Sequence, residues 1–205
     1  MADSPITICN LALSHLGDTK GISSFTDRTN AARACQLWYD QVRDEVLRDF
    51  AWPFAKRTAA LALVATDPGT LGEWAYSYRA PADVLTISRI VPYTGMRVAS
   101  PSNLVRFHTG ADDAGGLLYL DLPNAVVEYT VRVTDVTRFP PDFVAALALK
   151  LAAAIAPSVM AGDPSRLGLR ALELYERQVN IARANALNEQ LPDEQPESSF
   201  ITGRE

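Results

Sequence analysis

Apolar residues in the first 50 positions recur every three or four residues, the spacing that places them on one face of an α-helix. Ser4 followed by Pro5 predicts the start of a first helix, since serine caps helices and proline suits their first position. Gly17 is expected to end it. The predicted inward face consists of Ile8, Cys9, Ala12, Leu13 and Leu16.

A second amphipathic helix is expected from Ala31, with Asp27 as its N-cap, and it must stop before Pro53. The stretch from Phe54 to Ala65 is open to one or two further helical turns, which the Asp67, Pro68, Gly69 run would end. The inward stripe of this second helix is predicted to be Ala31, Cys35, Trp38, Val42 and Val46. The solvent face is predicted to carry Asp40, Arg43, Asp44 and Arg48.

Aromatic side chains gather around this helix end. We interpret Trp38, Trp52 and Phe54 as structural core, because aromatic residues beside a helix end are more often buried than ligand-binding. The alternative is an aromatic ligand pocket that would also use Trp74 and Tyr76.

From residue 74 to 133 the period changes to two, which is typical of strands with one buried and one wet face. Buried positions are expected at Val127, Tyr129, Val131 and Val133, and wet ones at Glu128, Thr130 and Arg132. Further strands are predicted at 85–91, 104–107 and 117–122. Pro123 with Asn124 predicts a tight hairpin turn, so a small antiparallel sheet is expected between two helical halves.

The final third returns to helical spacing. A helix from Pro141 to about residue 161 has alanine and leucine on nearly every side and needs neighbours all round it, whereas whether Pro157 kinks or ends it stays open. After a break at Gly162, Asp163 and Pro164 predict the start of a helix to about residue 190. Its inward stripe is expected to be Leu167, Ala171, Leu174, Tyr175, Gln178 and Ala182.

Together these patterns predict an α+β fold, mainly α: a helical bundle with an inserted small antiparallel β-subdomain and an extended C-terminal arm. The expected parts are N-terminal helices in 1–73, the β-subdomain in 74–138, C-terminal helices in 139–190 and the arm in 191–205. In the polar arm, Phe200 and Ile201 are interpreted as anchors for another chain. The alternative is a disordered terminus with two incidental apolar residues.

Charge and composition narrow the function. The net charge is −5, and residues 191–205 carry −3 of it, so tight nucleic-acid binding is disfavoured because such binding depends on cationic side chains. Cys9 and Cys35 fall on apolar faces and are interpreted as buried reduced thiols, which indicates a reducing compartment during folding. Residues 1–7 carry no basic region typical of a signal peptide, so synthesis in a cytoplasm is expected. The alanine-rich run 144–161 is interpreted as a buried helix and not as a membrane span.

The residue inventory offers little chemistry. His15 and His108 lie on different predicted elements, and no zinc spacing, phosphate-binding loop, dinucleotide-binding pattern or nucleophilic serine motif is present. Asp112 and Asp113 are interpreted as a solvated turn, because an EF-hand needs alternating oxygen donors. We therefore expect no catalytic, cofactor-binding or metal-binding residues, and no enzyme activity.

Four segments in order resemble the tail tubular protein A family, the head-to-tail adaptors of short-tailed bacteriophages. The first is CNLALSHLG at 9–17, and the helix that follows is similar to the family in Tyr39, Asp40, Arg43, Asp44, Leu47 and Arg48. The third segment contributes Trp52, Phe54, Ala55 and Arg57, and the fourth Tyr78, Pro81, Ala82, Asp83 and Leu85. The helical last third and the end of the chain at Ile201 to Arg204 are also similar.

This resemblance implies a homo-oligomeric ring, of twelve copies by the family rule, that joins the portal protein to the tail nozzle, a tail tubular B-like protein. Double-stranded DNA would leave through the ring without specific binding, and the protein would be part of the virion at the head–tail junction after its synthesis in the bacterial host cytoplasm. Phe200, Ile201 and Arg204 are the expected contacts with the portal or a neighbouring subunit.

Three alternatives stay open. The closest is a head-completion, stopper or tail-completion ring protein of a long-tailed phage, which would share a helical adaptor architecture. A soluble helical ligand-binding or regulatory protein would need a basic DNA-reading helix, which we do not find. An enzyme would need convergent polar groups that this sequence barely supplies.

Overall fold

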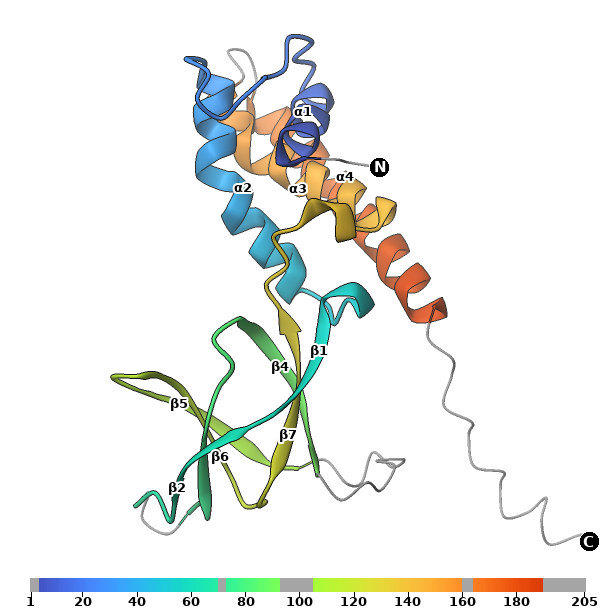
Figure 1. Ribbon diagram of the computed structural model, residues 1–205. Helices are drawn as coiled ribbons and strands as arrows, with labels where there is room; N and C mark the ends of the chain where they lie inside the picture. Colours follow the sequence, from blue (N-terminus) through green and yellow to red (C-terminus); the bar gives the residue numbers. More distant parts are fainter. Residues whose placement is uncertain (1–3, 70–72, 93–104, 160–163, 190–205) are drawn as a thin grey trace, which may run out of the picture.

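The computed structural model describes residues 4–69, 73–92, 105–159 and 164–189, and in them four α-helices accompany two antiparallel sheets, which confirms the α+β class. The helices gather at one end of the molecule and the strands at the other (Figure 1). The helices are α1 (Pro5–His15), α2 (Asn30–Arg48), α3 (Pro141–Val159) and α4 (Pro164–Asn188), with short 3-10 turns η1 (Pro53–Ala55) and η3 (Val136–Arg138). The strands are β1 (Lys56–Ala60), β2 (Ala62–Thr66), β3 (Tyr76–Arg79), β4 (Val84–Pro92), β5 (Phe107–Asp112), β6 (Gly115–Leu120) and β7 (Ala125–Val131).

Helix α1 begins and ends as its sequence predicts. Ser4 caps it, and its C-terminus is closed by two hydrogen bonds, from the Gly17 amide to the Ser14 carbonyl and from the Asp18 amide to the Leu13 carbonyl. This pairing requires a left-handed residue, and Gly17 supplies it at φ +83°. The whole predicted inward face of α1 is buried.

Helix α2 begins two residues later than its predicted cap allows. Its N-cap is Thr29, whose hydroxyl accepts a hydrogen bond from the Ala32 amide at 3.1 Å. The prediction of Asp27 is wrong because that carboxylate instead accepts hydrogen bonds from the Ser23 and Ser24 amides within the preceding loop. These bonds hold the pKa of Asp27 below its usual range.

Helix α3 packs against α1, α2 and α4, in agreement with its apolar composition. It continues through Pro157 to Val159, so the proline does not end it at Ala156. By length and composition α3 could cross a membrane, but 56% of the apolar window is buried inside the protein. The predicted break at Gly162 and cap at Asp163 lie outside the described residues.

Helix α4 turns a slightly different face inward from the one predicted. Leu174 is 38% exposed, whereas Val179 and Ala186, which the predicted stripe omitted, are buried. The buried positions step by four and three residues and so form one stripe along α4. They are Ala171, Tyr175, Val179, Ala182 and Ala186.

The strands begin at Lys56, well before the change of period at Trp74. The interpretation of Phe54 to Ala65 as helical turns is therefore wrong: one 3-10 turn is followed by β1, which pairs with β7, and β2, which pairs with β3. Alanine-rich segments favour helices by themselves, but here pairing with distant strands overrides that preference.

The strands form two sheets and not one. Their orders are β1-β7-β4 and β2-β3-β6-β5, so β6 and β7 belong to different sheets. The predicted hairpin at Pro123 and Asn124 is therefore wrong, and Asn124, at φ +54°, lies where the chain crosses between the sheets. The strand predicted at 104–107 is instead β5, and Leu104 lies outside the described residues.

Strand β7 is buried on both faces. Val127, Tyr129 and Val131 are buried as predicted, but Glu128 and Thr130, expected to be wet, are only 9% and 1% exposed. The reason is topological, because β7 lies between β1 and β4 at the centre of its sheet.

Candidate functional site

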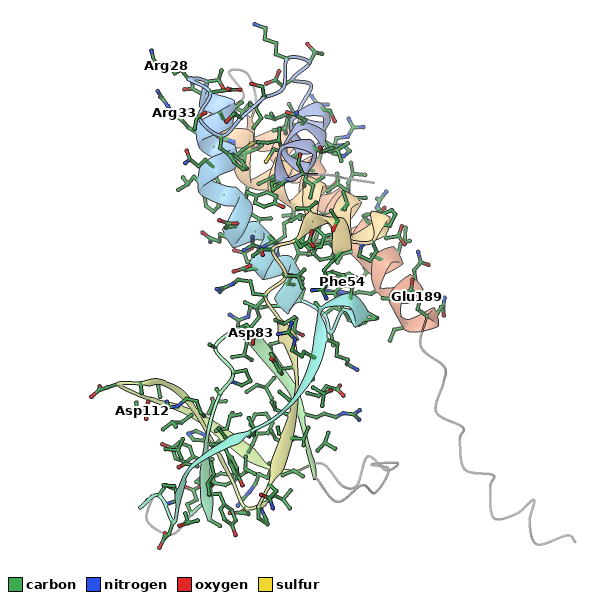
Figure 2. All side chains as sticks on the ribbon, in the orientation of Figure 1. Arg28, Arg33, Phe54, Asp83, Asp112 and Glu189 are labelled. Carbon is green, nitrogen blue, oxygen red and sulfur yellow. The ribbon has the colours of Figure 1, made fainter. Side chains whose placement is uncertain are left out.

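An aromatic cluster joins the helices to the start of the strands. Trp52 is 2% exposed, and its ring centroid lies 5.1 Å from that of Phe50 and 5.2 Å from that of Phe143. Phe54, labelled in Figure 2 below the helices, makes an edge-to-face contact with Phe143 at 5.0 Å between ring centroids. The Trp52 indole donates to the Val46 carbonyl at 2.8 Å, so its polar atom is satisfied. A cavity of only about 40 Å³ remains beside the cluster, which makes it core and not a ligand pocket.

The other aromatic residues considered for a pocket lie elsewhere. Trp38 is half-buried on α2 and packs against the core. Trp74 stacks on His108 at 6.5 Å, and Tyr76 lies 6.2 Å from Tyr78 in the second sheet. The predicted contact residues Phe200, Ile201 and Arg204 lie outside the described residues.

A chain of ion pairs ties α2 to the segment that follows β7. Arg43, predicted on the solvent face, is 5% exposed, and its guanidinium bonds to Asp40 at 2.6 Å and Asp44 at 2.8 Å. Asp44 also bonds to Arg132 at 2.8 Å. Arg43 is buried because the chain around residue 132 lies against this face of α2, and the two carboxylates satisfy its charge.

The first sheet carries two further charged clusters. Asp83, labelled in Figure 2 at the end of the sheet nearest the helices, accepts hydrogen bonds from Arg57 at 2.6 Å and from the Tyr129 hydroxyl at 3.0 Å. Burial and the bond to this carboxylate raise the pKa of Tyr129.

Glu128 is the buried carboxylate of this sheet. It bonds to Lys56 at 2.9 Å on β1 and to Arg89 at 3.1 Å on β4, so it ties the central strand to both neighbours. Burial opposes its ionisation, but the hydrogen bonds from Lys56 and Arg89 outweigh that effect and hold the pKa of Glu128 below its usual range.

Asp49, just after α2, links three helices. Its carboxylate accepts a hydrogen bond from the Tyr175 hydroxyl of α4 at 2.7 Å and lies 3.4 Å from the Lys150 ammonium of α3. Its carbonyl accepts a bond from Arg183 at 3.3 Å. Burial, followed by the bond to Asp49, raises the pKa of Tyr175.

Several open grooves remain on the described surface. One, about 690 Å³, runs between the sheets and is lined mainly by alanine and glycine, with the Arg79–Asp112 pair, bonded at 2.6 and 2.9 Å, at its side. This pairing lowers the pKa of Asp112, which also bonds to the Ala114 amide as a turn residue does.

The second groove, about 410 Å³, lies between α1 and α3 and is mostly apolar. It was not anticipated from the sequence because its walls are more than 120 residues apart along the chain. Its lining residues are Thr7, Leu11, His15, Phe139, Pro141, Val144, Ala145 and Ala148.

Large apolar side chains are also exposed singly on two helices and one edge strand. On α4 they lie on both flanks of the buried stripe, and on β2 they lie at the edge of the second sheet. They are Leu37 on α2, Leu63 and Val64 on β2, and Leu169, Leu172, Leu174, Ile181 and Leu187 on α4.

No cluster of metal-ligating side chains is assembled from the described residues. Within 4–69, 73–92, 105–159 and 164–189, no three His, Cys, Asp or Glu side chains gather as metal ligands. Cys9 and Cys35 are buried free thiols, and hydrogen bonding to Cys35 together with burial raises the pKa of Cys9. Compared with known proteins, the sequence matches no family model and no curated protein.

Proposed function

We propose that this chain is a structural phage protein: a ring-forming adaptor that joins the portal to the tail nozzle and surrounds the exit path of the DNA. The main support is what the segments resembling tail tubular protein A do in the fold. Asp44 of the second segment pairs with Arg132, just after β7. Trp52 and Phe54 of the third segment, just before β1, pack on Phe143 of α3, so these two segments join helices to strands. Arg43 supports Asp44 within α2, and Asp83 forms its ion pair within the first sheet. A framework that holds two parts rigidly together suits a protein that acts by assembly.

The exposed apolar residues support the same function. A closed ring requires two different complementary surfaces on each copy. Leu169 and Leu187 lie on one flank of α4 and Leu174 and Ile181 on the other, so this helix offers apolar side chains in two directions. We propose that the four helices act as one bundle and that neighbouring copies cover these flanks.

The charge of the chain fits a channel through which DNA slides. With a net charge of −5 the protein should bind DNA phosphates only weakly, because tight binding requires lysine and arginine contacts that neutralise them. In this proposal the C-terminal residues Phe200, Ile201 and Arg204 reach the portal or the next copy.

The test is negative-stain electron microscopy of the purified chain, alone and after mixing with rings of its portal. The adaptor proposal expects a new collar of density on the portal, to which nozzle protein then adds. A monodisperse monomer that ignores the portal would refute it. A collar that binds no nozzle protein would favour the stopper or tail-completion alternative.

A further inference from the structure

The α1/α3 groove is an apolar surface without a partner in the described structure. Its volume of about 410 Å³ is within the range of about 300–1,000 Å³ that ligand-binding clefts occupy. Leu11, in its wall, is 41% exposed, an unfavourable position for leucine in water. His15 is the only ionisable side chain in its lining. The groove therefore favours an apolar segment, and any charged residues of that segment should be acidic.

The chain itself carries a segment of that chemistry. After Leu191 its only large apolar residues are the adjacent pair Phe200 and Ile201, and they follow a stretch that contains Asp193, Glu194 and Glu197. Burying this pair would remove two large apolar side chains from water, which is favourable.

The place where α4 ends brings this pair within reach of the groove. Asn185, in the last turn of α4, donates a hydrogen bond to Asp142 in the first turn of α3. Pro141 and Val144 of that same turn line the groove. Ten residues lie between Glu189 and Phe200, and the eleven Cα–Cα steps that join them can span up to about 36 Å, whereas a helix with its side chains is about 10–12 Å wide. The chain can therefore pass around the start of α3 to the groove.

Charge favours the same path. Arg138 is exposed and precedes Phe139, which forms one end of the groove, and its guanidinium donates to the Phe54 carbonyl at 2.9 Å. Phe54 shares a small cavity with Glu189 at the end of α4, so Arg138 has neighbours on both sides of this path and acidic residues of the passing chain can pair with it. Asp135, Asp142 and Glu189 are acidic residues near this path; Asp142 is already bonded to Asn185, and Asp135 to Thr137.

We propose that Phe200 and Ile201 dock in the α1/α3 groove of their own chain in the free protein. The docked pair shields both the groove and the anchor from water until a partner competes for the anchor. Release of the anchor on the portal rests on the proposed adaptor function, whereas docking in the free protein does not.

The test places the photo-crosslinking residue p-benzoyl-phenylalanine at Phe200 of the full chain and maps the crosslinked peptides by mass spectrometry. Equal amounts of ¹⁴N- and ¹⁵N-labelled protein are mixed before irradiation. Docking in the same chain predicts crosslinks to peptides containing residues 7–15 or 139–148, without hybrid ¹⁴N–¹⁵N products. Hybrid products at the groove would show that another copy supplies the anchor and would overturn the proposal.

A charge in the groove provides the matched comparison. Leu11→Glu should reduce the groove crosslink by about tenfold, because a carboxylate loses solvation when an apolar pair covers it. Leu37→Glu makes the same change at a leucine that is 71% exposed on α2 and should leave the crosslink unchanged. Circular dichroism melts check that both variants fold. An equal crosslink yield in Leu11→Glu and the unsubstituted groove would refute the docking.

Adding portal rings separates the two proposals. The groove crosslink should decrease as the collar forms. A collar without any groove crosslink in the free protein would refute the docking and leave the adaptor function intact. A groove crosslink that portal rings leave unchanged, with a collar present, would refute the release step.

Discussion

Trp52 is the residue through which the helices and the strands share one core. It lies between the end of α2 and the start of β1, with Phe50 and Phe143 against its ring and its indole bonded to the Val46 carbonyl. Both its apolar surface and its one polar group are therefore used inside the subunit.

Replacing this side chain tests its role as core. Trp52→Ala should lower the free energy of unfolding by about 3–5 kcal/mol, because it removes a buried aromatic side chain and leaves a cavity. Urea denaturation followed by circular dichroism measures the change. Leu37→Ala, at an exposed site on α2, is the control and should change it by less than about 0.5 kcal/mol. A small loss in Trp52→Ala together with failed ring formation would instead identify an interface residue.

Glu128 is the residue whose charge ties β1, β7 and β4 together. Its folded-state pKa lies below the unfolded value, so the ionised carboxylate stabilises the fold above a pH of about 4.3, and this contribution disappears as the pH falls through the folded value. Because Lys56 and Arg89 remain partly exposed, solvent screens the pair and the expected contribution at pH 7 is about 1 kcal/mol.

Glu128→Gln should therefore lower the free energy of unfolding by about 1 kcal/mol at pH 7 and by progressively less towards pH 3. Urea denaturation of both proteins at pH 7, 5, 4 and 3 measures the difference. Glu173→Gln, at an exposed position of α4, is the matched control. A difference that stays constant or grows as the pH falls would contradict this account of Glu128.

At the scale of elements, the helices were largely predictable because their start and end signals are local. Ser4 and Gly17 specify the ends of α1 by hydrogen bonds to its first and last turns, and Pro5 by the fixed φ that suits the first helical position. The strands β1 and β2 were not predictable from local pattern, since Lys56 and Ala62 take their conformation from partners 74 and 17 residues away. Glu128 was predicted to be wet for a related reason, because nothing in the sequence near it shows that β7 has a strand on either side.

The aromatic cluster could likewise be predicted from local sequence, whereas the α1/α3 groove could not. The aromatic cluster was predicted as core from the spacing of Trp52 and Phe54 beside a proline. The α1/α3 groove was not, because it exists only when residues near Leu11 and Val144 are brought together by folding.

Asp49, at the end of α2, is bonded to α4 through the Tyr175 hydroxyl and the Arg183 guanidinium. Tyr175→Phe keeps the ring that Lys150 covers at 5.2 Å but removes the hydroxyl that donates to Asp49 at 2.7 Å. The expected loss in the free energy of unfolding is about 1.5–3 kcal/mol, the range for hydrogen bonds to charged groups.

A double-mutant cycle with Asp49→Asn, measured by urea denaturation, isolates this interaction. Each substitution should lower the free energy of unfolding more in the unsubstituted protein than in the protein that already carries the other substitution. Strictly additive losses would show that Tyr175 and Asp49 act independently and that another contact holds α4 to the end of α2.

At the scale of the whole molecule, assembly should depend on the C-terminal anchor and not on the fold. Deletion of residues 191–205 should leave a protein with an unchanged helical circular dichroism spectrum that no longer joins heads. The double variant Phe200→Ala, Ile201→Ala is the matched comparison, since it keeps the length and charge of the segment. It should fail to join heads as completely as the deletion does. Normal incorporation of either variant into virions would refute the role of the anchor.

Helix α3 also sets the order in which this protein can fold. It is the element against which α1, α2 and α4 all pack, yet it begins only at Pro141. While the chain is being synthesised from its N-terminus, the apolar faces of α1 and α2 therefore stay unpacked until α3, more than 90 residues downstream, has been made. Such distant contacts slow folding, so the helical core forms only after α3 has left the ribosome, with the strands already outside it.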